Sequence, residues 1–108
     1  MNKVKEQFVI PSGIQLMCRP IDVVFEGDLV NKQDIRGGAR YRTNQIVIQE
    51  DIPRAVSMPY DHQVETYFHE VGPWIFNLLE REDLNEDEKL IEQMGKLLAQ
   101  AALTARYE

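Results

Sequence analysis

The hydrophobic periodicity of this chain changes once, near residue 60. Between residues 8 and 50, apolar and polar residues tend to alternate, and β-branched residues and turn glycines are concentrated there. Beyond residue 60, apolar residues recur at spacings of three and four. A period of two is typical of strands, and a period near 3.6 is typical of helices. The order predicts an α+β fold, in which a small twisted N-terminal β-sheet packs with two C-terminal helices.

The strand signals in the first half differ in strength. The run 8–10 predicts a short strand that the turn signal at 11–13 ends. Alternation over 14–25 predicts a half-buried strand that Pro20 interrupts, with Cys18 as an ordinary buried residue in it. The segment 39–49 predicts a hairpin whose second arm carries three successive β-branched residues.

Prolines and polar residues set the expected limits of the helices. Pro59 suits a first helical turn, whereas Pro73 cannot donate to the carbonyl of His69 and predicts a kink or a stop. Asn85 is the expected N-cap of the second helix, with Glu88 three residues later. The expected segments are an N-terminal arm or short strand at 1–13, the sheet at 14–50, one helix at 58–81 and a second at 85–106.

The length and net charge of the chain exclude several classes of protein. The 108 residues suit a single domain spanning 1–108, and one cysteine excludes an intramolecular disulfide. The net charge of −6 argues against direct binding to nucleic acid or to an anionic membrane surface. The apolar stretches are far shorter than the ~20 residues that a membrane span requires. We therefore expect a cytoplasmic protein with reduced Cys18.

A near-match to a metal-binding motif stands at His69-Glu70-Val71-Gly72-Pro73. In His-Glu-x-x-His helices, two histidines four residues apart reach one zinc ion, and the glutamate polarises the metal-bound water. Here His69 and Glu70 are present, but Pro73 stands at the position of the second histidine and has no ligand atom.

Residues around this motif extend the match. Tyr67–Val71 and Trp74-Ile75 are followed by the acidic loop 83–87 and by the segments 88–91 and 95–98. Over residues 14–100 the chain resembles small zincin-like proteins, often encoded by phages or prophages, that are related to the ImmA/IrrE-type metallopeptidases. The resemblance implies a minimal zincin-like fold, with His69 as first metal ligand, Glu70 as general base and Glu88 as acidic ligand. The middle ligand is replaced by Pro73.

Other interpretations of these residues stay open. Glu88 fits a capping box without any metal, and His69 fits a histidine at the edge of the core, bonded to backbone or to Glu88. Glu65, four residues before His69, is an alternative ligand, whereas His62 is about 10 Å away along the helix and too far to share an ion. Trp74 and Phe76 are expected in the core.

Acidic residues gather over residues 80–92, around the loop between the two predicted helices. The simplest interpretation is a solvated loop whose acids favour the positive end of the second helix. The functional interpretation is a negative patch, with Asp83, Glu86 and Asp87 as partner-binding residues, that docks on a basic surface. Seven acids lie within thirteen residues here: Glu80, Glu82, Asp83, Glu86, Asp87, Glu88 and Glu92.

Three functions follow as hypotheses. The first is a catalytically degenerate zincin-like protein that acts by binding a protein partner, with no cofactor expected. The second is a zinc-dependent peptidase with a noncanonical ligand set, in which Glu70 is catalytic and His69 and Glu88 bind the metal. The third is an acidic inhibitor of a nucleic-acid-processing host enzyme.

Overall fold

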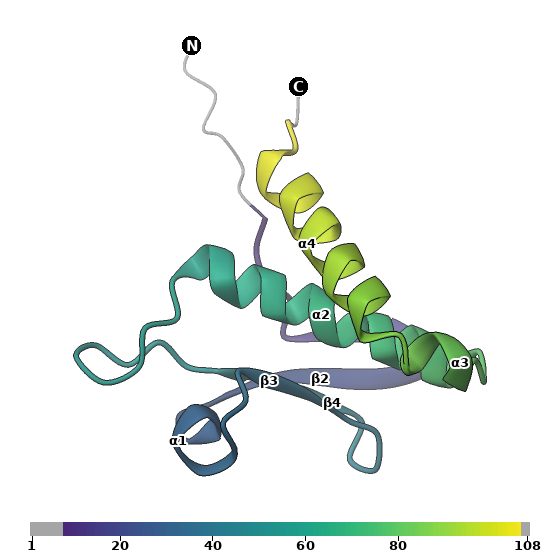
Figure 1. The fold of residues 1–108 in the computed structure, drawn as a ribbon, viewed down its shortest axis with the longest axis horizontal. Coiled ribbons are helices and arrows are strands. Elements are labelled where there is room, and N and C mark those ends of the chain that lie inside the picture. The colour runs from purple at the N-terminus through teal and green to yellow at the C-terminus, as the bar shows by residue number, and fades with distance from the viewer. Residues whose placement is uncertain (1–7, 107–108) are drawn as a thin grey trace.

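Two antiparallel pairs of strands, joined through a parallel pair, build the sheet of this α+β protein (Figure 1). The computed structural model describes residues 8–106. The spatial order is β1-β2-β4-β3, in which β2 and β4 run parallel. The strands are β1 (Gly13–Leu16), β2 (Arg19–Glu26), β3 (Gly37–Arg40) and β4 (Gln45–Gln49).

The hairpin predicted at 39–49 is confirmed, but the first strands differ from expectation. Residues 8–10 are not in a strand, and residues 1–7 of the expected arm lie outside the described part. The chain reverses at Met17-Cys18, where φ is 49° and 63°. These left-handed values close a two-residue hairpin turn, although the sequence has no Asn or Gly there to signal it. The prediction of a buried strand residue at Cys18 was therefore wrong, because the thiol is exposed in the turn.

Strand β4 lies at the centre of the core because both of its faces are covered. Ile46 and Ile48 face the first long helix and are fully buried, together with Trp74 from that helix. On the opposite face lies the short helix α1 (Leu29–Gln33), which the periodicity did not predict (Figure 1). Gln49, also fully buried, accepts from Val30 N at 2.9 Å and so attaches α1 to the sheet. Burial on both faces explains the unbroken apolar run in β4.

The first long helix, α2 (Tyr60–Leu78), covers one face of the sheet (Figure 1). It begins after Pro59, which is the N-cap residue rather than part of the first turn. A kink or a stop was expected at Pro73, and the stop does not occur: the helix continues through Pro73, as in the predicted range 58–81. An interior proline costs about 3 kcal/mol, and the complete burial of Trp74 in the next position offsets that cost. The helix ends before Glu80, which has a φ of 56°.

Two further helices follow α2. They are α3 (Glu82–Asn85) and α4 (Glu88–Thr104), and α4 packs on α2 rather than on the sheet. The prediction that Asn85 is the N-cap of α4 was wrong. The N-cap is Asp87, whose Oδ1 accepts a hydrogen bond from Leu90 N at 3.0 Å. Glu88 is then the first helical residue, so the capping-box interpretation of Glu88 was wrong.

Candidate functional site

Helix α2 directs His69 and Glu70 to different surroundings. Successive helical positions differ by about 100° in direction. Glu70 therefore lies buried against the sheet, 9% exposed, while His69 is half-exposed and faces α4. His69 Nδ1 lies 3.2 Å from Glu70 Oε2. The partner of His69 is thus Glu70, and not backbone or Glu88 as the sequence interpretation had it.

A glycine lets α4 approach the motif closely. A Cβ on Gly95 would lie 3.1 Å from both the backbone nitrogen and the Cα of His69. Any side chain at this position would therefore push the two helices apart. Gly95 is fully packed, and its small size fixes the spacing at which residues of α4 can face His69.

The space between α2 and α4 is a cleft of about 370 Å³. It brings together His69, Pro73 and Glu88, whereas Glu70, the predicted general base, is not among the lining residues. Sequence reasoning missed Asn85 and Glu92 as members of the site. Glu92 had a usable signal, because it lies four residues after Glu88 on the same helix face. The complete lining is His69, Pro73, Asn85, Glu88, Ile91 and Glu92.

Asn85 joins α3 to the base of this cleft. Its Nδ2 donates to the carbonyl of Pro73 at 3.4 Å and lies 3.5 Å from the hydroxyl of Tyr41. Its Oδ1 is buried without a hydrogen-bond partner among the described residues. A buried acceptor in this state is costly and uncommon. The carbonyl of Pro73 therefore holds a side chain that sequence reasoning assigned to a helix cap.

The residues of the cleft do not suit a zinc ion. A catalytic zinc site needs three protein ligands, and Pro73 supplies none. Within residues 8–106 no three His, Cys, Asp or Glu side chains gather closely enough to hold a metal ion. This also applies to Glu65, whose negative charge acts on His69 but which completes no ligand set there. We therefore assign no chemical step to a metal.

The hydrogen bond with Glu70 raises the pKa of His69 above its usual 6.5, against the opposing effect of burial. The charges of Glu70, Glu92 and Glu65 act in the same direction as the hydrogen bond. When the pKa of a histidine is higher in the folded state than in the unfolded state, its protonation stabilises the fold at any pH below the unfolded-state pKa. This stabilisation is lost as the pH rises through the folded-state pKa.

We therefore expect the free energy of unfolding to fall by at most about 1 kcal/mol between about pH 6 and pH 8, because solvent screens the half-exposed ring. Urea unfolding across this range measures the change. His69→Gln should flatten the profile. A profile unaltered by His69→Gln would show that the Glu70 pair does not contribute.

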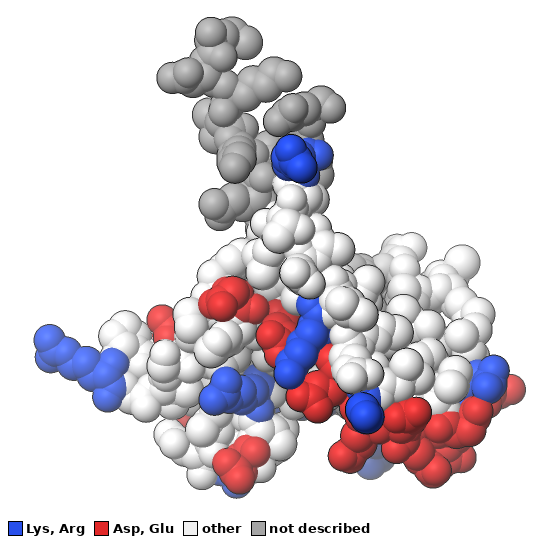
Figure 2. Space-filling view, turned by 45° about the horizontal axis from the view of Figure 1, so that its top comes forward, with Lys and Arg blue, Asp and Glu red and all other residues white. Residues whose placement is uncertain are grey.

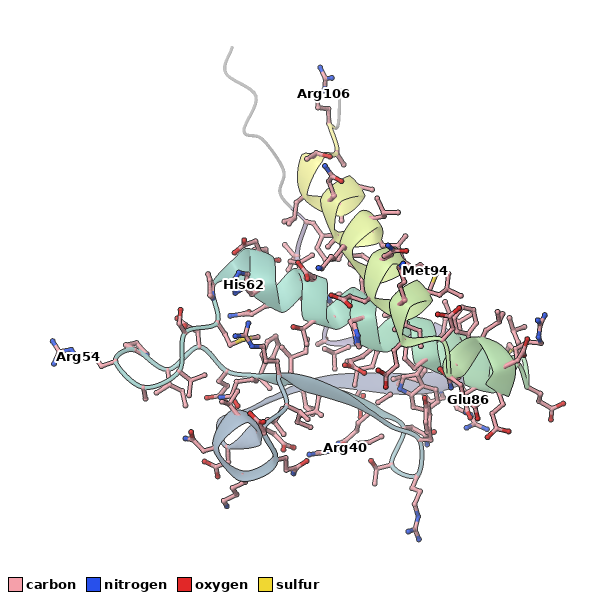
Figure 3. All side chains as sticks on the ribbon, viewed as in Figure 1. Arg40, Arg54, His62, Glu86, Met94 and Arg106 are labelled. Atoms are coloured by element: carbon pink, nitrogen blue, oxygen red, sulfur yellow. The ribbon has the colours of Figure 1, made fainter. Side chains whose placement is uncertain are left out.

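The predicted partner-binding acids lie at the α3 end of the molecule, where Asp and Glu side chains gather (Figure 2). All three are exposed, but two already have partners. Asp83 forms an ion pair with Arg81 at 2.7 Å, and Asp87 caps α4. Glu86 points outward beside α3, far from His62 at the other end of α2 (Figure 3). The acids thus form one negative end of the molecule.

The helices of the described part do not include one that is both long and apolar enough to cross a membrane. Comparisons with protein families, with curated proteins and with solved structures found no match to this chain. The function must therefore be argued from the cleft and its surroundings.

Proposed function

We propose that this chain is a catalytically degenerate zincin-like protein that acts by binding a protein partner. The observation that carries the proposal is the composition of the α2–α4 cleft. His69 and Glu88 line it together, and the residue one helical turn after His69 is Pro73, which has no ligand atom. The position of a third ligand is therefore occupied by a residue whose side chain cannot bind a metal ion.

The open edge of β3 supports a binding role. Gln49 N donates to Arg36 O, and the antiparallel register then alternates, so Gly37 and Ala39 direct their N–H and C=O groups away from β4. Among residues 8–106 no other hydrogen bond reaches these groups. An extended segment of a partner can add to such an edge as a further strand. Gly37 lies beside Glu70, so the added strand would run next to the motif.

The test is to return the missing ligand. We expect the wild-type chain, purified without chelator, to hold no stoichiometric zinc, and Pro73→His to bind one zinc ion with His69 and Glu88. At zinc concentrations about 100 times Kd, binding would stabilise the variant by about 2.7 kcal/mol. Elemental analysis gives the stoichiometry, and thermal unfolding with and without zinc gives the stabilisation.

Pro73→Ala is the matched control, because it regains the backbone N–H donor without adding a ligand. Failure of Pro73→His to bind zinc would show that the cleft does not have zincin-like geometry. Stoichiometric zinc in the wild-type chain that disappears in His69→Ala would replace the proposal with the metal-dependent peptidase.

Location in the cytoplasm remains a prediction from the sequence.

A further inference from the structure

A second, apolar hollow lies where the end of α2 meets the β1–β2 hairpin. Its volume is about 110 Å³, close to that of one large side chain. Met17 is 69% exposed, Leu79 50% and Ile75 36%, so the walls are accessible. Every lining residue is apolar: Leu16, Met17, Ile75, Leu78 and Leu79. Exposed apolar side chains that converge in this way indicate a contact surface, unlike apolar residues scattered singly.

Left-handed backbone fixes both walls of the hollow. Met17 stands in the hairpin turn at φ 49°, and Leu79 directly precedes Glu80, which has φ 56°. Glu80 N donates to Asn77 O and Arg81 N to Phe76 O, which closes the end of α2 as a Schellman motif. Walls held by hydrogen-bonded turns lose little freedom when a ligand binds.

The surroundings of the hollow are negatively charged. The negative end of the α2 dipole lies here, and the last turn of the helix has no basic residue to compensate it. Glu80 follows at once, and Glu82 and Asp83 begin α3. The one cation in this stretch, Arg81, is committed to Asp83 through two hydrogen bonds of 2.9 and 2.7 Å. Arg19, paired with Leu16 in the β1–β2 hairpin, is the cation on the opposite side of the hollow. On the α2–α3 side, a positive group would therefore meet a net negative field.

From these features we infer that the hollow anchors one bulky apolar side chain of a basic protein segment. The anchor side chain fills the hollow between Met17 and Leu79, and flanking Lys or Arg residues face Glu80 and Glu82. Central apolar anchors supply most of the affinity in such contacts, and rim charges supply orientation and association rate. The inference rests on the proposed binding role and names the chemistry of the partner.

A random-peptide display library selected on the full chain tests this inference. We expect the enriched peptides to share one Leu, Ile, Phe or Met flanked by at least two Lys or Arg. Synthetic copies should lose at least about tenfold in affinity for Met17→Gln and for Leu79→Gln. Affinity should also fall for Glu80→Gln combined with Glu82→Gln, and it should weaken as salt is raised.

Leu97→Gln is the matched control, because Leu97 is 66% exposed on α4 and lies outside the hollow. It should change affinity by less than about twofold. No enrichment, enrichment of neutral or acidic peptides, or equal binding to the Met17→Gln/Leu79→Gln double variant would overturn the inference. So would a dimer in sedimentation velocity that Met17→Gln dissociates, since a second copy would then occupy the hollow. None of these readouts involves zinc, so they fail or succeed separately from the Pro73→His test.

Discussion

Trp74→Ala should lower the free energy of unfolding by about 3–5 kcal/mol, the largest loss that we expect from one substitution in this chain. Trp74 is fully buried between α2 and the sheet. Its Nε1 donates to Gln45 O at 3.1 Å, and its ring meets that of Tyr41 edge-on with centroids 4.9 Å apart. Alanine would leave a cavity and remove the hydrogen bond to Gln45 O. A domain is stable by only about 5–15 kcal/mol, so the loss is a large fraction of the total.

Urea and thermal unfolding would measure the effect, with a fall in the melting temperature of roughly 4–8 °C for each kcal/mol. Ile75→Ala is the control, since the neighbouring Ile75 is 36% exposed, and it should cost well under half as much. Trp74→Phe separates the two causes, because it keeps most of the buried area but removes the N–H donor. A loss below about 1 kcal/mol for Trp74→Ala would contradict the placement of α2 on the sheet.

Gly37→Ala should cost about 1–3 kcal/mol, although alanine is the smallest possible addition. A Cβ at this position would lie 2.4 Å from Thr66 Cγ2 and 2.9 Å from Val47 O. Thr66 can be repacked, but Val47 O is backbone in β4 and can move only if the β3–β4 pairing shifts. The same Cβ would lie 3.4 Å from Glu70 Oε2, so the substitution is made beside the motif.

The adjacent glycine provides the control. At Gly38 a Cβ would meet only Val47 Cγ1 at 3.5 Å and Ile35 Cδ1 at 3.9 Å, which are ordinary contacts. Gly38→Ala should therefore be within about 0.5 kcal/mol of neutral in urea unfolding. Thr66→Ser removes the Cγ2 atom and should recover part of the loss in the Gly37→Ala background. Equal effects of the two glycine substitutions would show that β3 does not approach α2 as described.

The sequence predicted the elements whose signals are local. The β-branched run in β4, the hairpin that contains it and the helical periods of α2 and α4 follow from residues close together in the chain. The errors also have local causes. Cys18 looked like a strand residue because Met17-Cys18 lacks the Asn or Gly that usually adopts left-handed backbone. Asn85 looked like an N-cap because a cap signature cannot distinguish Asn85 from Asp87, two residues later.

The composition of the cleft was predictable only in part. His69 and Glu88 were singled out from the sequence, and the structure places them around one space with Pro73. Asn85 and Glu92 were missed, because their membership depends on how α3 and α4 lie against α2. The hydrogen bond between His69 and Glu70 was also missed.

The amino-acid sequence by itself determined the α+β class, the position of the sheet before the two long helices and the absence of a ligand atom at residue 73, because periodicity and side-chain chemistry are properties of neighbouring positions. Only the tertiary structure decided that α2 continues through Pro73, that β3 approaches Glu70 at Gly37 and that two separate hollows open on α2. The physical reason is that these features depend on contacts between residues far apart in the chain. The burial of Trp74 keeps α2 helical against the helix-breaking preference of Pro73. The absence of a side chain at Gly95 sets the spacing between α2 and α4.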